Sequence, residues 1–404
     1  MPMNATVAIL PLLLVNAGFF SNLEPALAVD ARAESRARPA GQVEPDRFAS
    51  GEIEFIPGVL AGIRHPSMGL VLRYAPSVTW TTYDEMRDPL ILHQGMARLF
   101  VDLGDSVRLV GAHIRQHGER NFAAAIVHEE DGGRLRLEFL PDIDRIAIDG
   151  HFSRLGAVWE PTHRQEYSVF GGYSSFGGRG EWARRRLPKQ TGPWGSLEAD
   201  IGVSSRNAIV ASTRASHTTF EPGPTFLIWE ADTGVRRQWD RNTEVTGLVG
   251  VFTGFNEQPV GDELRSVILP TLRGELTRLY GLGRQEAELE VVVSARPGIN
   301  QLYARLDPRV TAEGFLDWSW RDRIGASLEA GRAWVFDEGI SLGGRILVTG
   351  GGLTVPLTTD WDLQGGMRIF RQSVRFGQDN WTRGYWRWNV YFALSFNSEL
   401  FPRP

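Results

Sequence analysis

The sequence predicts an all-β fold, a closed transmembrane antiparallel β-barrel of about 16 strands, with a range of about 14–18. Three observations predict it. Apolar and polar residues alternate with a period of two over most of the chain. The alternating segments run to a dozen residues or more, and the connections between them alternate between short and long. Residues 51–397 are assigned to this barrel.

The last alternating segment shows the period most clearly. Polar or charged residues such as Arg387 and Asn389 separate its apolar positions. Strands that cross a membrane need about 9–11 residues, whereas strands of soluble proteins average about 5–6. A soluble β-sandwich or solenoid stays open as the alternative fold. In the barrel, the lipid-facing side of the terminal strand consists of Trp386, Trp388, Val390, Phe392, Leu394 and Phe396.

Short and long connections alternate as they do in outer-membrane barrels, where periplasmic turns are short and extracellular loops long. The short ones are Gly104-Asp105, Ser204 to Asn207, Asp240 to Thr243, Gly281 to Arg284, Arg321 to Arg323 and Leu357 to Asp360. The long ones are Thr81 to Pro89, Gly177 to Gln190, Asn256 to Arg265, Pro297 to Pro308, Phe336 to Leu342 and Ser373 to Arg383.

About sixteen strands fit between Gly69 and Phe396, an even number that returns the C-terminus to the periplasm. Two segments leave the count open. Asn121 to Leu140 is either a hairpin within a loop or two further wall strands, and Glu52 to Arg64 is either a further strand or a periplasmic extension. Tryptophans near predicted strand ends favour aromatic girdles at the two membrane interfaces. These are Trp80, Trp159, Trp239, Trp320, Trp334 and Trp361.

The N-terminus has the pattern of an export signal. An apolar stretch from Val7 to Phe20 precedes Ala26-Leu27-Ala28, a small-x-small site that predicts a signal peptide over residues 1–28. No Lys or Arg precedes the apolar stretch, so a buried or anchoring helix is the alternative. Residues 29–50 are expected to form a flexible periplasmic segment, and residues 398–404 a C-terminal tail.

Composition excludes several classes of function. The net charge of −5 argues against a dedicated nucleic-acid binder. Cysteine is absent, so disulfides, cysteine-zinc sites and catalytic thiols are impossible. No run beyond the first 20 residues approaches the length of an uncharged spanning helix. No cofactor is expected.

The segment LRYAPSVTW (Leu72 to Trp80) and the aromatic terminal strand WNVYFALSF (Trp388 to Phe396) resemble uncharacterised outer-membrane β-barrel proteins of GC-rich Gram-negative bacteria. The resemblance covers roughly residues 50 to 397. The resemblance implies an outer-membrane location. The chain is also loosely similar to barrels that accompany polysaccharide export. The terminal strand is similar to the signal by which barrel-assembly machinery recognises its substrates, with Phe396 or Phe401 as the final aromatic.

A search for catalytic and metal sites selects no residue. His113 and His117 share a strand face, but the acidic and histidine partners that complete a metal site are not evident. Ser, His and Asp residues are present without the spacing of a hydrolase site, so no catalytic and no metal-ligating residue is predicted.

The charged residues that alternate against the apolar face are predicted to line the lumen, because an unpaired charge in a dry core costs several kcal/mol and a wet lumen avoids that cost. Phe315 and Tyr391 offer aromatic surface beside them. The predicted lumen-lining residues are Arg73, Arg98, Glu198, Asp200, Arg214, Glu230, Asp232, Arg273, Glu275, Glu286, Glu288, Glu290, Glu313, Asp317, Glu329, Asp362, Arg368 and Arg387.

The hypothesis that follows is a pore or export channel for polar solutes, and not an enzyme. Secreted polysaccharide is one cargo that this hypothesis includes. Its expected partners are outer-membrane lipid, the assembly machinery during insertion and, for export, periplasmic components, with no nucleic acid. Two alternatives stay open: a closed barrel that acts as an adhesion or structural surface protein, and a hydrolase with its site at the barrel rim.

Overall fold

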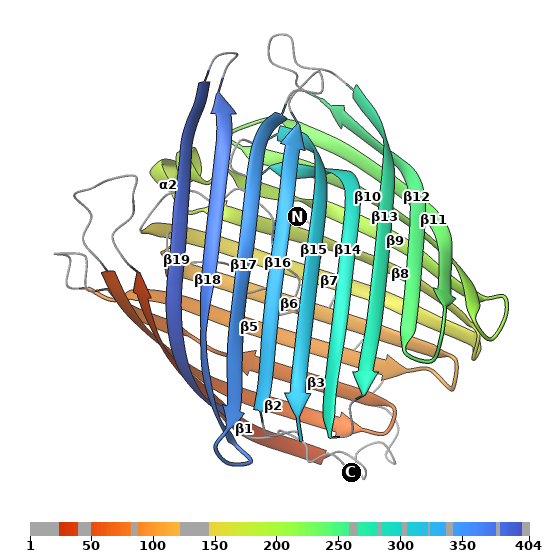
Figure 1. Cartoon of the computed structure of the whole chain (residues 1–404), viewed down its shortest axis with the longest axis horizontal. Helices are drawn as coiled ribbons and strands as arrows, with labels where there is room; N and C mark the ends of the chain where they lie inside the picture. The colour runs from red at the N-terminus through yellow and green to blue at the C-terminus, as the bar shows by residue number, and fades with distance from the viewer. Residues whose placement is uncertain are drawn as a thin grey trace, which may run out of the picture.

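A computed structural model describes residues 24–38, 50–81, 88–121, 145–257, 266–281, 284–300, 305–321, 324–336, 342–376 and 380–397. It contains one antiparallel sheet that closes on itself as a barrel (Figure 1). The expected hairpin or wall strands over 122–140, the tail over 398–404 and residues 1–23 of the expected signal lie outside this description. No helix in the described ranges is both long and apolar enough to cross a membrane.

Within the described residues, the sheet has nineteen strands and one short helix accompanies it. Their bounds are β1 Glu24–Arg38, β2 Ser50–His65, β3 Met68–Tyr74, β4 Ser77–Thr81, β5 Leu90–Asp102, β6 Val107–Arg120, β7 Ile146–Thr162, β8 Gln165–Gly178, α2 Glu181–Arg186, β9 Lys189–Gly202, β10 Asn207–Glu221, β11 Thr225–Gln238, β12 Thr243–Asn256, β13 Ser266–Gly281, β14 Gln285–Asn300, β15 Arg305–Trp320, β16 Ile324–Phe336, β17 Leu342–Pro356, β18 Trp361–Phe376 and β19 Asn380–Asn397.

The wall has 18 positions, because β3 and β4 share one place between β2 and β5. Both pieces keep one register with β2, and that register places Pro57 opposite Pro76 at the break. Proline has no backbone N–H, so two opposed prolines remove both donors of this ladder pair. The pairing of β1 with β19 closes the barrel, from Asp30 opposite Asn397 to Ala37 opposite Val390.

The number of wall positions falls within the predicted range. The central value of sixteen was counted from Gly69 onward and therefore left out β1 and β2. The expectation of a flexible segment over 29–50 is wrong for residues 29–38, which belong to β1. Asp30, Arg32 and Glu34 share one face of that strand, while alanines occupy most of the other. Glu52 to Arg64 lies within β2 and is a wall strand.

Short turns lie together at one end of the barrel, and longer connections at the other. In the turn between β11 and β12, Asp240 accepts hydrogen bonds from the Asn242 backbone N–H at 2.8 Å and from Thr243 Oγ1 at 3.1 Å. These bonds, first of all that from Asn242, lower the pKa of the Asp240 carboxyl. By the outer-membrane pattern, the short-turn end is periplasmic, and it also holds the start of β1 and the end of β19.

Two of the predicted long loops are shorter than expected. β14 and β15 continue their mutual pairing to Asn300 opposite Arg305, so most of Pro297 to Pro308 is a hairpin rather than a loop. Likewise β18 extends to Phe376 and β19 begins at Asn380, within the predicted loop Ser373 to Arg383. The prolines had suggested a loop in the first case, but paired in register they are compatible with a strand.

The outer face of the barrel carries an apolar belt. Exposed large apolar side chains alternate along the strands, as Leu363 and Met367 do on β18 and Ile268 and Leu272 on β13. On the terminal strand, Trp388, Phe392 and Leu394 are exposed on this outer side, and the Phe396 ring lies 5.0 Å from that of Trp361. The side chain of Trp386 lies outside the described residues. The apolar side chains face outward instead of meeting in a shared core, as in a barrel surrounded by lipid.

Candidate functional site: the inner wall and its extracellular end

Alternation along each strand separates outward from inward positions. On β3 the exposed Leu72 and Tyr74 face outward, which places Arg73 on the inner side. The same parity places every predicted lumen residue on an inward position. Arg387 pairs in register with the inward Phe370, but the side chain of Arg387 lies outside the described part. These inward residues are Arg73, Arg98, Glu198, Asp200, Arg214, Glu230, Asp232, Arg273, Glu275, Glu286, Glu288, Glu290, Glu313, Asp317, Glu329, Asp362 and Arg368.

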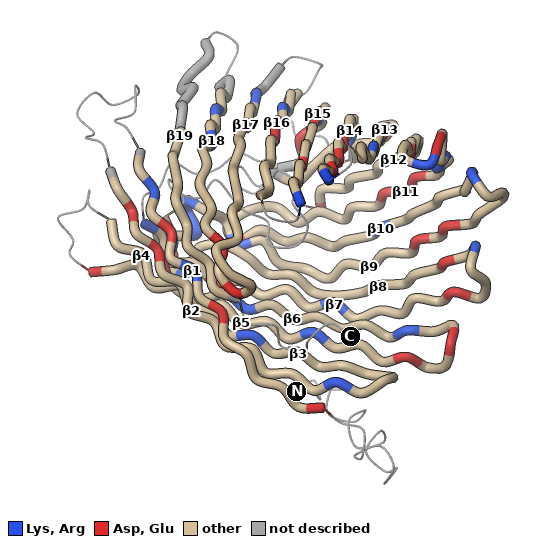
Figure 2. The backbone as a smooth tube through the Cα atoms, turned by 60° about the horizontal axis from the view of Figure 1, so that its bottom comes forward, with Lys and Arg blue, Asp and Glu red and all other residues tan. Residues whose placement is uncertain are grey.

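An ion-pair network lies on the inner face of β1 and β2. Glu34, which is 5% exposed, accepts hydrogen bonds from Arg32 at 2.7 Å and from Arg36 at 2.5 Å. Arg36 also reaches Glu54 at 2.5 Å and lies 3.8 Å from Glu52. None of these residues was predicted, because β1 was expected to be flexible. Figure 2 shows basic and acidic positions interspersed along this part of the wall. The network braces the strands next to the closing seam.

Other inward charges pair between strands that are separated by one intervening strand. Arg73 donates to Asp30 at 2.6 Å, and the Asp30 side chain crosses Gly58 of β2 to reach it. A Cβ at Gly58 would lie 1.6 Å from the Asp30 carboxylate, so this approach requires glycine. Arg368 donates to Glu329 at 2.6 Å, a pair in which both members were predicted.

Further pairs follow the same rule. Arg236 contacts Asp200 at 2.5 Å, and Arg273 pairs with Glu275 two residues along its own strand. The Thr271 hydroxyl donates to Asp232. Most of these pairs join two strands across a third, so bracing of the wall accounts for a large share of the inward charge.

A different surface lies on the inner face of β7 to β10, where arginines rest on aromatic rings. The Arg154 guanidinium lies 3.6 Å from the centroid of the Phe170 ring, and that of Arg214 lies 5.5 Å from the Trp194 ring. Phe152 stacks on Trp194 with 5.6 Å between ring centroids. Neither arginine makes an ion pair within 4.0 Å with the described residues, and both are exposed to the lumen. The sequence had indicated Arg214 but not Arg154, Phe170 or Trp194.

Acidic residues gather on the inner face of β14 and β15 near the short turns. Glu288 lies opposite Asp317 in register, and Glu286 is two residues along β14. With Asn242 and Ser327 they line a cavity of about 550 Å³. In the described part of the chain, Glu286, Glu288 and Asp317 form no ion pair, so the wall opposite the arginine-aromatic surface carries unneutralised negative charge.

The β14–β15 hairpin covers part of the inner wall at the extracellular end. Pairing of β14 with β13 ends at Ala295, and pairing of β15 with β16 ends at Arg309. Beyond these residues, β14 and β15 pair only with each other among the described strands and form the tip of the hairpin. Ile299 and Leu306 at this tip pack against inward apolar residues of β10, β11 and β12. This cluster consists of Phe220, Phe226, Ile228 and Phe252.

Polar contacts add to this packing. Arg296 of the tip lies 3.8 Å from Glu230 on β11, and Arg309 donates to the Ile299 carbonyl at 3.1 Å. The tip therefore folds toward the lumen and narrows it. This feature was not predicted, because the sequence of the segment indicated a loop.

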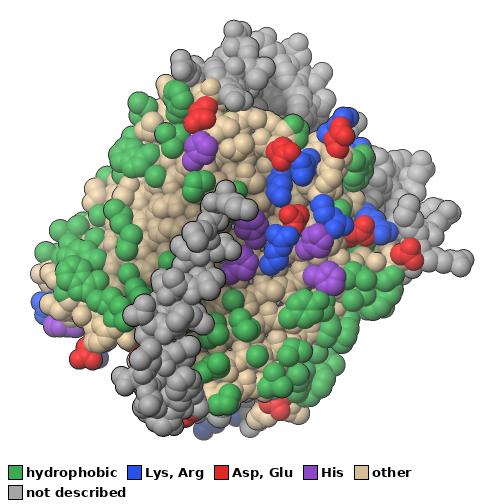
Figure 3. Space-filling view, turned by 180° about the vertical axis from the view of Figure 1, so that it is seen from behind, with side chains coloured by type: hydrophobic (Ala, Val, Ile, Leu, Met, Phe, Trp, Pro, Cys, Tyr) green, Lys and Arg blue, Asp and Glu red, His purple; other side chains and the backbone are tan. Residues whose placement is uncertain are grey.

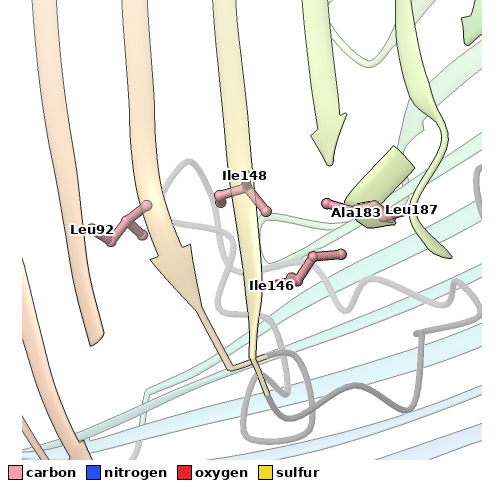
Figure 4. Close-up of a cluster of buried hydrophobic side chains, with 5 residues drawn as sticks. All are labelled: Leu92, Ile146, Ile148, Ala183 and Leu187. Atoms are coloured by element: carbon pink, nitrogen blue, oxygen red, sulfur yellow. The ribbon is translucent and has the colours of Figure 1, made fainter. Parts of the chain in front are cut away.

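Helix α2 covers a second part of the inner wall (Figure 4). Ala183 of the helix and Leu187 just after it pack against Leu92, Ile146 and Ile148, which face inward from β5 and β7. Burial of this apolar face holds a three-arginine segment, Arg184 to Arg186, at the extracellular end of the barrel. The hairpin tip and α2 thus both pack on the inner wall at this end of the barrel.

No cluster of three or more His, Cys, Asp or Glu side chains with the geometry of a metal site occurs within the described ranges. Tyr391 lies against the inner wall, where a Cβ at Gly352 or Gly366 would come within 2.8 Å or 2.7 Å of its hydroxyl oxygen. The glycine run Gly350 to Gly352 belongs to β17.

The chain matches no protein-family model and no curated protein sequence. Solved structures share its fold. A BenF-like porin from Pseudomonas fluorescens superposes with a TM-score of 0.51 at 8% identity, over 93% of this chain and 99% of the porin. Pseudomonas aeruginosa OpdK with vanillate and OccK2 (OpdF) with glucuronate each give a TM-score of 0.50 at 10% identity, over 93% of this chain and 98% of theirs.

These likenesses establish the fold, that of outer-membrane porin barrels of Gram-negative bacteria. Together with the closed sheet and the outward apolar belt, they place the protein in the outer membrane.

Proposed function

We propose that the protein is a channel through which small organic anions, carboxylates attached to a ring, cross the outer membrane. One observation carries the proposal: Arg154 and Arg214 are held over aromatic rings on the inner wall, exposed, and without an ion-paired carboxylate in the described residues. A guanidinium binds a carboxylate through two parallel hydrogen bonds, and the partly exposed Trp194 offers aromatic surface for a solute ring beside Arg214.

The arrangement of charge across the lumen supports the same function. Arginines lie on the β7–β10 side, and the carboxylates of Glu286, Glu288 and Asp317 lie on the β14–β15 side. Charges of opposite sign on different parts of a water-filled lumen with low-dielectric walls orient a polar solute. An anion with an apolar ring is drawn to the basic side, where the aromatic rings are. The vanillate and glucuronate in the titles of two structures with this fold are ring carboxylates, which agrees with this solute class.

The polysaccharide cargo expected from the sequence receives no support from these structures, whose titles name porins and small acids. The hairpin tip and α2, both packed on the inner wall at the extracellular end, favour small solutes over a polymer chain. One of these titles names a porin and none of the three names an enzyme, and no described residue set favours the rim hydrolase.

The test is transport by the purified protein. In planar bilayers with a KCl gradient we expect channel currents with anion preference, and in liposomes faster uptake of vanillate and glucuronate than of uncharged glucose. The double variant Arg154→Gln/Arg214→Gln should lower both the anion preference and vanillate uptake, because it removes the unpaired cations. Arg332→Gln, an outward arginine that lies over Trp334 on the outer wall, is the matched control and should change neither.

Two results would overturn the proposal. Absence of current from folded protein would favour the closed surface barrel, and equal uptake of glucose and glucuronate would indicate an unselective pore.

A further inference from the structure

A polar cluster interrupts the outward apolar belt on β6, β7 and β9. Seen from behind, histidine, basic and acidic side chains gather on the outer face with hydrophobic side chains beside them (Figure 3). By strand parity, the exposed Leu109 and Leu155 set the outward side of β6 and β7. The cluster shares that side and consists of His113, Arg115, His117, Asp149, His151, Arg179 and Lys189.

One carboxylate holds the cluster together. Asp149 accepts from Arg115 at 2.6 Å, from Lys189 at 3.2 Å and from His117 at 3.3 Å. Arg179 lies 2.7 Å from the other nitrogen of the His117 ring. Two permanent cations, Arg115 and Lys189, therefore share one carboxylate, and a third, Arg179, contacts His117 beside it. A guanidinium alone has five N–H donors. The cluster keeps positive charge and donors that its own acceptors do not satisfy.

The histidines extend the cluster across the wall. His151 stacks on Tyr173 with 5.4 Å between ring centroids, and His113 lies 2.8 Å from the Ser153 hydroxyl. The nearby Glu119 adds no acceptor, because it is paired with Arg145 at 2.5 Å. The polar surface is thus continuous, and its charge excess is cationic.

The height of the cluster identifies its surroundings. On β18, outward positions stay apolar from Trp361 to Ile369, and Arg371 is the first charge. On β6, polar side chains begin at His113, six residues above Val107. With a rise of about 3.3 Å per residue and a tilt near 45°, the polar surface begins about 9 Å lower on β6 than on β18. It therefore extends from the extracellular interface into the outer leaflet.

A charge that faces hydrocarbon is destabilising, most strongly at the membrane midplane and less toward the interface. An anionic group in the same leaflet offsets that cost. We propose that the cluster binds the phosphate groups of the anionic glycolipid of the outer leaflet, with Arg115, Lys189 and Arg179 as the donors. Acyl chains of the same lipid would then lie over the apolar belt below, on Leu155 and Val169.

A second copy of the chain fits the cluster less well. Among the described wall strands, the outward carboxylates are Glu119, Asp149 and Glu221, all on this side of the barrel. Glu119 and Glu221 are paired with Arg145 and Arg184, respectively. No outward acidic surface elsewhere on those strands is available to receive the cations of a neighbouring copy.

The test uses full-length protein in detergent and two probes, diphosphoryl lipid A and the same lipid after removal of both phosphates. Native mass spectrometry should show bound diphosphoryl lipid A, and Arg115→Gln/Lys189→Gln should weaken its binding by about tenfold or more, as expected for the loss of two charge-assisted contacts. Arg332→Gln, an outward arginine outside the cluster, should bind as the unsubstituted protein does.

A second measurement needs no variant. Lys189 is the only lysine in the chain, so amine labelling followed by peptide mapping reports on this position alone. We expect diphosphoryl lipid A to slow labelling of Lys189 and the dephosphorylated lipid to leave it unchanged.

The proposal is overturned if both lipids bind or protect equally, or if Lys189 is unreactive before any lipid is added. It is also overturned if the double variant changes the number of copies in the purified particle instead of lipid binding, because the cluster would then be an interface between copies. If the double variant fails to fold, the labelling experiment decides.

Discussion

At the scale of single residues, this barrel uses inward charges in two ways, and burial separates them. Arg36 and Glu34 are enclosed by a network on β1 and β2, with Glu34 5% exposed. Arg154 and Arg214 instead face the lumen over aromatic rings. We expect the first group to give stability and, under the proposed function, the second group to give solute recognition. A substitution in one group should therefore change stability with little change in solute preference, and a substitution in the other should do the reverse.

Glu34→Gln tests the structural group. The substitution keeps the shape of the side chain but removes the buried carboxylate that both Arg32 and Arg36 contact, and Arg36 keeps only Glu54 and Glu52 among the described residues. We therefore expect a loss of about 3 kcal/mol in the free energy of unfolding. Urea unfolding in lipid vesicles, followed by tryptophan fluorescence, measures it.

The control is Glu181→Gln in α2. Its partner Arg185 is as close, at 2.5 Å, but both side chains are largely exposed, so the change should stay below about 0.5 kcal/mol. Equal effects of Glu34→Gln and Glu181→Gln would show that burial does not govern the strength of the pair.

At the scale of elements, opposed prolines mark the places where the ladder is interrupted or leaves the wall. Pro57 lies opposite Pro76 at the break between β3 and β4. Pro297 lies opposite Pro308 where β14 and β15 stop pairing with β13 and β16. In each pair two backbone donors are missing at once, so the local ladder is weak. Beyond the second pair, the hairpin is held instead by apolar packing on the inner wall.

Leu306→Asp should release this hairpin tip. The substitution places a charge against Phe220, Phe226 and Phe252, and loss of the leucine contact alone costs about 2 kcal/mol or more. Without that anchor the tip leaves the inner wall, and single-channel conductance should rise. Leu357→Ser, in an exposed short turn, should leave conductance unchanged. Unaltered conductance in Leu306→Asp would mean that the tip does not narrow the lumen.

The sequence predicted those elements whose outward positions are large and apolar. On β18, for example, Trp361, Leu363 and Met367 alternate with polar residues, and the strand was anticipated. On β1 the outward positions include Ala31, Ala33 and Ala37, so the period of two carries little contrast in hydrophobicity and the strand was missed.

For the site, parity along the strands was enough to find the inward charges. It was not enough to find Arg154 with Phe170, or the inward hairpin tip. Both depend on which strands become neighbours and on how far each pairing extends, and neither is local information in the sequence.

At the scale of the whole molecule, closure depends on a seam that lies wholly beyond the predicted signal-peptidase site. β1 pairs with β19 over Asp30 to Ala37, whereas Glu24 to Ala28 pair only with β2. Cleavage after Ala28 would therefore remove five residues of β1 without touching the seam. The remaining stretch, Val29 to Arg38, still has the length of a membrane-spanning strand, about 9–11 residues.

Two truncations test whether the seam closes the barrel. Protein that lacks residues 1–28 should refold in detergent and migrate faster in an SDS gel before heating than after it, because a closed barrel resists unfolding by the detergent. Protein that lacks residues 1–38 should lose this heat-dependent shift, because β2 and β19 would each have an unpaired edge. A shift that persists without residues 29–38 would show that β2 and β19 can close the wall directly. Protein isolated from outer membranes should begin at Val29, and a longer N-terminus would contradict cleavage after Ala28.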